Sequence, residues 1–210
     1  MPQEIETVMT KRQSIREFDP KVKISRDEMT AMLKMAITAP SACNLQAWKF
    51  IVVDTPAGKE KLRHYFMPFN FPQVDTSAAV VLFFGNKLAY KKYRKLWQGM
   101  YKAKKVTKEA MEAALNTFMP LYEHASEAML KTDATIDTSL AAMQFMLIAQ
   151  AHGYDTNAIA GYDASKAAES VGLDPEQFVP VMAVAIGKSA KAPVAMRTSR
   201  YDIGESVDYQ

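Results

Sequence analysis

Three cations and a hydroxyl lie within six residues near the N-terminus, in the stretch Lys11-Arg12-Gln13-Ser14-Ile15-Arg16. Because side chains alternate along an extended chain, Arg12, Ser14 and Arg16 would share one side of it. Two guanidinium groups and a hydroxyl can together bind a phosphate dianion, and each charge-assisted hydrogen bond would contribute roughly 1.5–3 kcal/mol. Taken alone, the stretch fits a solvated basic loop at least as well, so the choice depends on the rest of the chain.

A second candidate stretch, Ala39-Pro40-Ser41-Ala42-Cys43-Asn44-Leu45-Gln46-Ala47-Trp48, precedes a predicted strand over residues 49–53. Its small residues allow a ligand to approach closely, and its amides can hydrogen-bond to the edge of a heterocycle. A turn around a buried Trp48 explains the same residues. Further along, residues 66–73 are rich in phenylalanine and proline and contain Asn70 and Gln73. This composition favours a loop that forms the wall of a pocket.

The sequence contains no recognisable nucleophilic or metal-binding motif. His64, His124 and His152 are far apart and belong to no HxxxH or HExxH pattern, and the one cysteine, Cys43, has no neighbouring histidine. Glycine-rich phosphate loops are absent. A chain with pocket-forming loops but no evident acid–base pair is a candidate for cofactor chemistry, in which the protein supplies binding and electrostatics.

Hydrophobic spacing predicts the elements that must position these loops. The capping box Ser25-Arg26-Asp27-Glu28 predicts a helix that ends before Pro40. The most apolar helix is expected to be capped by Thr135 or Asp137 and to end at His152-Gly153, and its apolar circumference indicates a core helix or a subunit interface. Further helices are expected over residues 4–11, 59–65, 164–171 and 107–130, the last with a break at Pro120, and strands over 49–53, 78–84, 155–160 and 179–187. Few strands separated by helices indicate an α/β or α+β fold in three layers.

The composition indicates a soluble globular domain of 210 residues, with a net charge of +3 and 49% hydrophobic residues. A single cysteine excludes an internal disulfide and fits a reducing compartment, and the acidic N-terminus lacks the apolar segment of a signal peptide. No uncharged apolar run reaches the roughly 18 residues of a membrane helix. We therefore expect one domain over residues 1–210, in the cytoplasm and with no membrane partner.

Residues 87–108 contain nine cations and no acid, with aromatic residues at helical spacing. Such a helix can contact nucleic acid or a dinucleotide phosphate, or it can be an exposed helix whose aromatic stripe packs inward. We favour the exposed helix and expect no nucleic-acid partner. The polar tail after residue 188 keeps some apolar side chains, including Tyr201 and Ile203, so it needs a surface to lie on, such as a partner subunit.

Taken together, Arg12-Gln13-Ser14-Ile15-Arg16-Glu17-Phe18 and the stretch 39–48 resemble the two N-terminal motifs of the FMN-dependent nitroreductase family. The family pattern reads roughly R-x-S-x-R/K-x-F and, further on, A-P-S-x-x-N-x-Q-P-W before a strand. Residues 137–153 resemble the family's long central helix, and Ala158-Ile159-Ala160-Gly161-Tyr162 its flavin-adjacent strand end. The resemblance therefore covers nearly the whole chain.

This resemblance implies an α+β, three-layer α/β/α fold with a central, mostly antiparallel sheet. It also implies a homodimer that binds FMN at the subunit interface, with the central helix as the dimer helix and a domain-swapped C-terminal tail. The implied activity is transfer of a hydride from NADH or NADPH through flavin N5 to nitroaromatics, quinones or related small-molecule acceptors. Donor and acceptor would bind alternately, in a ping-pong mechanism.

The resemblance also implies roles for individual residues at the phosphate end of FMN. Arg12 and Ser14 would hold the phosphate and the ribityl chain, with Gln13 beside them. Arg200, together with Arg197, would complete the phosphate site.

The remaining implied contacts are to the flavin ring. Arg16 would stabilise the negative charge of the reduced flavin, and the backbone of Ala160 and Gly161 would face flavin N5. The pyrimidine edge would be contacted by Asn70 and Gln73. The partner subunit would contribute Pro40, Ser41 and Asn44. No residue is assigned a proton-transfer role, and no metal site is expected.

The chain departs from the family pattern at several positions. Ala47 stands where proline is usual, Ala42 and Cys43 stand where hydroxyl residues are common, and Ala160 stands where one branch of the family has glutamate. The alternatives to an oxidoreductase are an FMN carrier or sensor without turnover and a relative with other flavin chemistry, such as dehalogenation. The acceptor, the choice between NADH and NADPH and the role of Cys43 do not follow from the sequence.

Overall fold

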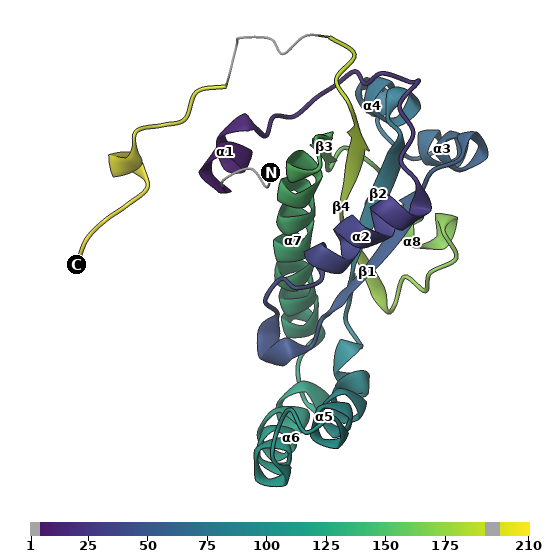
Figure 1. Ribbon diagram of the computed structural model, residues 1–210. Coiled ribbons are helices and arrows are strands. Elements are labelled where there is room, and N and C mark those ends of the chain that lie inside the picture. The colour runs from purple at the N-terminus through teal and green to yellow at the C-terminus, as the bar shows by residue number, and fades with distance from the viewer. Residues whose placement is uncertain (1–4, 192–197) are drawn as a thin grey trace.

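An antiparallel sheet forms the centre of the computed structural model, which describes residues 5–191 and 198–210 (Figure 1). Its spatial order is β1-β2-β4-β3, with β1 (Trp48–Val53), β2 (Ala79–Asn86), β3 (Asp155–Ile159) and β4 (Phe178–Gly187). All neighbouring strands pair antiparallel, and an isolated parallel bridge joins Ser14 to Thr156 beside β3. The predicted strands and the mostly antiparallel sheet are confirmed.

Each face of the sheet has its own apolar core, because successive residues of a strand point to opposite faces. Val80, Leu82 and Phe84 of β2 pack in one core, which includes residues of α3 (Pro56–Arg63), α4 (Phe71–Thr76) and α8 (Ala164–Ser170). Val81 and Phe83 pack in the other, with α2 (Arg26–Ala36) and α7 (Glu127–Ala151). Helices thus cover both faces of the sheet, and the expected α+β fold with three layers is confirmed (Figure 1).

The predicted capping box opens α2. The Ser25 side chain accepts a hydrogen bond from the Glu28 N–H at 3.1 Å, and the helix ends at Ala36, before Pro40. The N-terminal helix α1 (Ile5–Lys11) is followed by the basic stretch. Between α2 and β1 lies a short 3-10 turn, η1 (Ala42–Asn44), and between α3 and α4 lies a second, η2 (Pro68–Asn70).

The start of the long helix α7 was predicted wrongly. It begins at Glu127, where the Ser126 side chain accepts a hydrogen bond from the Met129 N–H at 3.2 Å. Thr135 and Asp137 lie inside the helix, because no helix breaker separates them from residue 127. The Asp137 carboxylate accepts hydrogen bonds from a neighbouring loop instead of capping the helix.

The break expected at Pro120 is also wrong. Helix α6 (Lys108–Glu123) continues through Pro120, and the chain leaves the helix at His124, whose N–H donates to the Pro120 carbonyl at 3.1 Å. A proline removes a single backbone donor, and here it does so one turn before the helix ends, where little helix remains to be disrupted. Helix α6 pairs with α5 (Tyr93–Lys102), which follows η3 (Ala89–Lys92), and Figure 1 shows this pair projecting beyond one end of the sheet.

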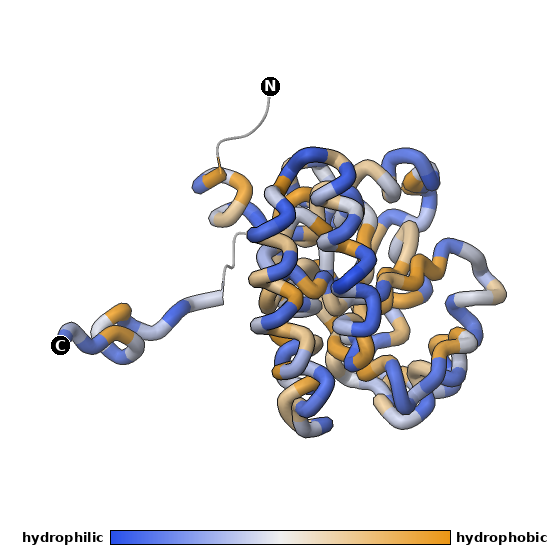
Figure 2. Tube along the Cα trace, turned by 90° about the horizontal axis from the view of Figure 1, so that it is seen from below, coloured by the Kyte–Doolittle hydropathy of each residue, from blue (hydrophilic) through white to orange (hydrophobic). Residues whose placement is uncertain are grey.

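The described part of the tail, residues 198–210, contains only the short turn η4 (Ile203–Glu205). Tyr201 is 85% exposed and Ile203 is 73% exposed, so these side chains are not covered by the body of the protomer. Figure 2 shows the hydrophobic residues of this segment lying apart from that body. Within residues 5–191 and 198–210, no helix has the length and apolar character needed to cross a membrane.

Candidate functional site

A cavity of about 380 Å³ brings the N-terminal basic stretch and the C-terminal tail together. Its lining consists of Met9, Thr10, Arg12, Gln13, Ser14, Thr198 and Arg200. The Arg200 guanidinium is oriented locally, since Nη1 donates to Thr198 Oγ1 at 2.8 Å and to the Ser199 carbonyl at 2.9 Å. The residues predicted for the phosphate site therefore meet, apart from Arg197, which lies outside the described residues.

The basic stretch is positioned by the edge of the sheet. The Ile15 N–H donates to the Thr156 carbonyl at 3.0 Å, next to the bridge between Ser14 and Thr156. Ile15 packs against the apolar core, so Ser14 on the opposite side is exposed. The chain then bends at residues 16–17, and Arg16 is exposed and does not line the cavity. Arg12, Ser14 and Arg16 were expected to share one side of the chain. Arg12 and Ser14 do line the same cavity, but Arg16 does not.

A second polar cluster lies where the chain leaves β3. The Asn70 Nδ2 donates to the Gly161 carbonyl at 2.9 Å, and the Gln73 Nε2 lies 3.4 Å from Asn70 Oδ1. Asn70 is 5% exposed and Gln73 is 2% exposed. A Cβ atom built on Gly161 would lie 2.5 Å from Asn70 Nδ2, so this close approach requires glycine. Ala160, beside Gly161, is exposed.

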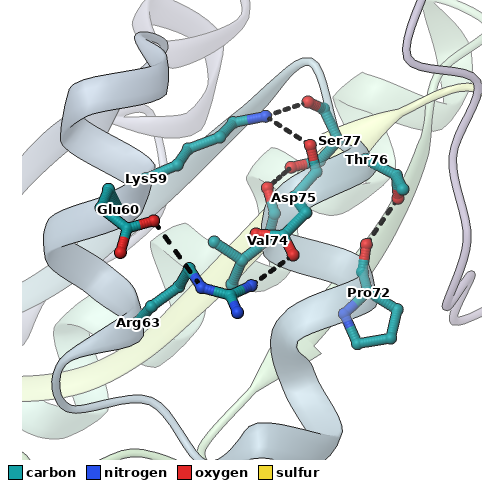
Figure 3. Close-up of polar contacts among 8 residues, drawn as sticks. All are labelled: Lys59, Glu60, Arg63, Pro72, Val74, Asp75, Thr76 and Ser77. Atoms are coloured by element: carbon teal, nitrogen blue, oxygen red, sulfur yellow. Dashed lines mark hydrogen bonds and ion pairs between the residues drawn. The ribbon is translucent and has the colours of Figure 1, made fainter.

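Helix α4, which carries Gln73, is fixed by α3 and by the N-terminal stretch. Figure 3 shows the side chains of Lys59 and Arg63 extending from α3 toward residues 75–77, at the end of α4. The Lys59 ammonium donates to the carbonyls of Asp75 and Ser77, and burial lowers the pKa of Lys59. Arg63 pairs with Asp75 at 2.5 Å, and the Phe18 N–H donates to Thr76 Oγ1 at 3.0 Å. These contacts hold the end of α4 and so fix the position of Gln73.

The loop over residues 40–47 is anchored by Asp137 of α7. The Asp137 carboxylate is 1% exposed and accepts hydrogen bonds from the backbone N–H of Ala42 at 2.8 Å and of Ala47 at 3.4 Å. Burial raises the pKa of Asp137. The loop needs this support, because Cys43, Asn44 and Gln46 all adopt left-handed backbone conformations, with φ of 48°, 60° and 52°. The sequence prediction assigned Asp137 a capping role, although an acid in an apolar helix was a signal for a buried anchor.

Tyr122 of α6 adds a further contact to this loop. Its hydroxyl donates to Asp133 Oδ2 at 3.1 Å and lies 3.8 Å from Cys43 Sγ. Burial, followed by the neighbouring Cys43 and Asp133, raises the pKa of Tyr122, so the hydroxyl is held protonated. Cys43 is half-buried and makes no disulfide.

Pro40, Ser41 and Asn44 do not join the cavity at Arg12 within one protomer. Their loop is bonded to Asp137, whereas Thr156, which holds the basic stretch, follows the C-terminal end of α7 at Ala151. The helix between residues 137 and 151 is about 21 Å long at 1.5 Å per residue. In Figure 1 the loop before β1 and helix α1 lie toward opposite ends of α7.

Comparisons with known proteins find similarity along most of the chain. The model of the nitroreductase family matches residues 9–188. The CLA biosynthesis enone reductase of Lactiplantibacillus plantarum is 50% identical over 202 residues, which are 96% of this chain and 92% of that protein. YdgI of Bacillus subtilis (strain 168), named as an NAD(P)H nitroreductase, is 42% identical over 183 residues, 87% of each protein. A crystal structure described as a nitroreductase from Exiguobacterium sibiricum in complex with FMN matches with a TM-score of 0.94 and 36% identity, covering 99% of this chain and 98% of that chain.

Proposed function

The chain belongs to the nitroreductase family of oxidoreductases, and from this we propose that it is an FMN-dependent enzyme that passes a hydride from NADH or NADPH to an organic acceptor. The observation that carries the FMN proposal is the cavity shared by Arg12, Ser14 and Arg200, beside the strand that leads to Gly161. We also propose one domain over residues 1–210 and a cytoplasmic location, since the single cysteine fits a reducing compartment.

The cavity fits the phosphate end of FMN. Arg12 and Arg200 contribute positive charge, and Ser14 and Thr198 contribute hydroxyl donors. A phosphate dianion between two guanidinium groups receives charge-assisted hydrogen bonds, which are stronger than neutral ones. In our proposal Arg197, whose placement is not described, would complete this end.

The cluster at Gly161 fits the ring end. Gln73 Oε1 is buried and has no hydrogen-bond partner among the described residues. A buried acceptor without a hydrogen-bond partner destabilises the folded protein. A ligand that donates a hydrogen bond to this acceptor therefore gains binding free energy. The Asn70 amide is already committed to the Gly161 carbonyl, which fixes the amides of this cluster in one orientation. A flavin pyrimidine edge has one N–H and two carbonyls. Its N–H can donate a hydrogen bond to Gln73 Oε1, which otherwise has no donor.

The bound FMN would supply two-electron chemistry, accepting a hydride at N5 and giving it up to the acceptor in a ping-pong mechanism. The protein's part is binding and electrostatics. Arg12 and Arg200 neutralise the phosphate, Asn70 and Gln73 orient the ring, and Arg16 provides a cation for the reduced state. Arg16 is exposed and makes no ion pair with a described residue, so its guanidinium is available for that role.

We propose that the enzyme is a homodimer with FMN at the interface. Ile136, Leu140 and Met143 of α7 are 53%, 42% and 39% exposed, and their spacing places them on one face of the helix. An exposed apolar face on the most apolar helix supports a second copy as its cover. Because the 40–47 loop lies far along α7 from the phosphate cavity, the partner subunit would supply Pro40, Ser41 and Asn44. The exposed tail would then cross onto that partner.

The acceptor class is the least constrained part of the proposal. Nitroaromatics and quinones remain candidates, and the 50% identity to an enone reductase adds α,β-unsaturated ketones. The alternatives are a carrier or sensor that binds FMN in the same site without catalysing a reaction, and an enzyme with other flavin chemistry, such as dehalogenation.

Anaerobic spectroscopy tests this proposal. The purified protein should show a flavin absorbance band that bleaches when NADH or NADPH is added and returns when menadione or an enone is supplied. A flavin band that neither donor bleaches would leave a carrier or sensor as the function. A preparation that neither contains nor binds FMN would overturn the cofactor assignment.

The variant Arg12→Ala tests the phosphate end separately. Loss of a charge-assisted bond to the phosphate should weaken FMN binding roughly tenfold or more, from about 1.4 kcal/mol upward. Titration of the apoprotein with FMN, followed by quenching of flavin fluorescence, measures this affinity. Lys11→Ala, which removes a neighbouring cation that does not line the cavity, is the matched control and should bind FMN like the wild type.

A further inference from the structure

Two buried hydrogen-bond donors without an acceptor lie in the apolar cluster against which Cys43 packs. Tyr93, the first residue of α5, is 2% exposed, and its hydroxyl has no hydrogen-bond partner among the described residues. The indole Nε1 of Trp97, about one turn further along α5, is also buried and also has no partner there. The two rings meet edge to face with their centroids 6.0 Å apart. Cys43 and Trp97 both pack against the cluster that contains Tyr93.

The Cys43 thiol is close to these donors. Burial raises the pKa of Tyr93, and the neighbouring Cys43 raises it further, so the Tyr93 hydroxyl keeps its proton and remains a donor. A second hydroxyl, that of Tyr122, lies 3.8 Å from Cys43 Sγ. The thiol therefore lies among polar groups of α5 and α6, within an otherwise apolar cluster.

An oxygen acceptor is what this cluster lacks. Tyr122 has one, because its hydroxyl donates to Asp133 Oδ2 at 3.1 Å. Tyr93 and Trp97 have none among the described residues, and a buried donor without an acceptor destabilises the fold. A thiol sulfur is only a weak acceptor. An oxygen atom bonded to Cys43 Sγ would supply a strong acceptor beside both donors.

Cys43 also has the setting of a cysteine that is oxidised and keeps one oxygen. It is half-buried, so a small oxidant can reach it. Residues 87–108, which include α5, contain nine cations and no acid, and a positive field favours the thiolate, which is the reactive form. The chain has no other cysteine, so no second thiol of the same chain can convert the product to a disulfide.

We propose that Cys43 is a site of reversible oxidation to a sulfenic acid by hydrogen peroxide, and that the added oxygen accepts hydrogen bonds from Tyr93 and Trp97. The thiolate sulfur attacks one peroxide oxygen, so a sulfur–oxygen bond forms while the oxygen–oxygen bond breaks. The departing hydroxide takes up the proton released by the thiol and becomes water. Sulfur is oxidised by two electrons and the peroxide is reduced by two. An external thiol reverses the reaction by displacing water to form a mixed disulfide, from which a second external thiol releases Cys43.

The experiment follows the sulfenic acid by mass spectrometry with dimedone, which adds to a sulfenic acid and not to a thiol. The purified flavin-containing protein, without nicotinamide, is treated with hydrogen peroxide, the excess is destroyed with catalase, and dimedone is added after increasing delays. The wild type should gain one dimedone adduct, located at Cys43. Treatment with dithiothreitol before dimedone should abolish the adduct, and Cys43→Ser should form none.

Two variants remove the donors one at a time. Tyr93→Phe keeps the ring and loses the hydroxyl, and Trp97→Phe keeps an aromatic ring and loses the N–H. In each, the sulfenic acid should disappear at least about fivefold faster than in the wild type, because it has lost a hydrogen bond. The matched control is Tyr101→Phe, the same change on the same helix at a tyrosine that is 43% exposed, and it should behave like the wild type. Urea denaturation of each variant in the reduced state checks that it is folded.

Several results would overturn the proposal. One is a wild type that gains no dimedone adduct after peroxide treatment while the urea-unfolded chain does. Another is a sulfenic acid whose lifetime is the same in the wild type and in both folded donor variants. Direct passage to a product with two added oxygens, or a disulfide between two copies on non-reducing electrophoresis, would also contradict it.

Discussion

Replacing Gly161 by alanine should disturb the ring end of the proposed flavin site through one side chain, Asn70. A Cβ atom at position 161 would lie 2.5 Å from Asn70 Nδ2 and 2.9 Å from Phe69 Cζ, and both contacts are too close for a folded protein. Asn70 is 5% exposed and donates to the Gly161 carbonyl at 2.9 Å. It therefore has little room to move, and moving breaks that hydrogen bond.

The structure sets the size of the effect. Leaving the buried Asn70 amide without its acceptor costs about 1–3 kcal/mol. Forcing an extra methyl group into this packed site costs about 1–3 kcal/mol more. We expect the free energy of unfolding of Gly161→Ala to fall by roughly 2–6 kcal/mol. Because Gln73 contacts Asn70, both amides should shift, and FMN affinity should fall roughly tenfold or more.

Urea denaturation followed by circular dichroism measures the stability, and titration of the apoprotein with FMN measures the affinity. Gly99→Ala is the matched control, because its new methyl group meets no atom of the described residues within 4 Å and should stabilise the helix by up to about 1 kcal/mol. A Gly161→Ala protein with wild-type stability and wild-type FMN affinity would refute the argument. Wild-type stability with weakened FMN binding would instead indicate that Gly161 contacts the ligand directly.

Three other substitutions probe the supports of the site. Asp137→Ala leaves two backbone N–H groups of the 40–47 loop without their acceptor, so the free energy of unfolding in urea should fall by roughly 1–3 kcal/mol; no change would mean that the loop is held by other contacts. Lys59→Met removes the donor to the carbonyls at the end of α4 and should lower the thermal midpoint, whereas Lys61→Met, on the same helix without such a bond, should not. Burial raises the pKa of Tyr162 to about 12. An unfolded tyrosine ionises near pH 10, so the folded state retains a proton that the unfolded state releases, and stability falls between about pH 10 and 12. Tyr162→Phe should lose roughly 2–3 kcal/mol less than wild type across that range, and parallel pH profiles of the two proteins would contradict the assignment.

The sheet was predictable because a strand that is buried on both faces requires a continuous run of apolar residues. The apolar run of residues 78–84 is typical of a strand buried on both faces, and β2 is buried throughout. Helix starts were less predictable. Ser25 is followed three residues later by Glu28 in a capping box, whereas Met129 stands at the equivalent position after Ser126, so the capping-box pattern is absent at the start of α7.

The candidate site was predictable where it depends on local chain geometry and family motifs, as for Arg12 and Ser14. It was not predictable where it depends on tertiary contacts. Arg16 lies at a bend and does not line the cavity, whereas Ser14 is bridged to Thr156, a partner far along the chain. The prediction that Asp137 caps a helix was wrong because its carboxylate accepts a hydrogen bond from the backbone of a loop that is also distant in sequence.

The sheet order also determines when the protein can fold. β2 pairs with β1, which precedes it, and with β4, whose first pairing residue is Phe178 opposite Asn86. On a translating ribosome, synthesis of the chain between these two residues takes on the order of 5–20 s at typical elongation rates. During that time the most apolar strand has one unpaired edge, and an unpaired apolar edge promotes association between chains. The nascent protein is therefore most vulnerable to aggregation after β2 has emerged, while α5, α6 and α7 are being made.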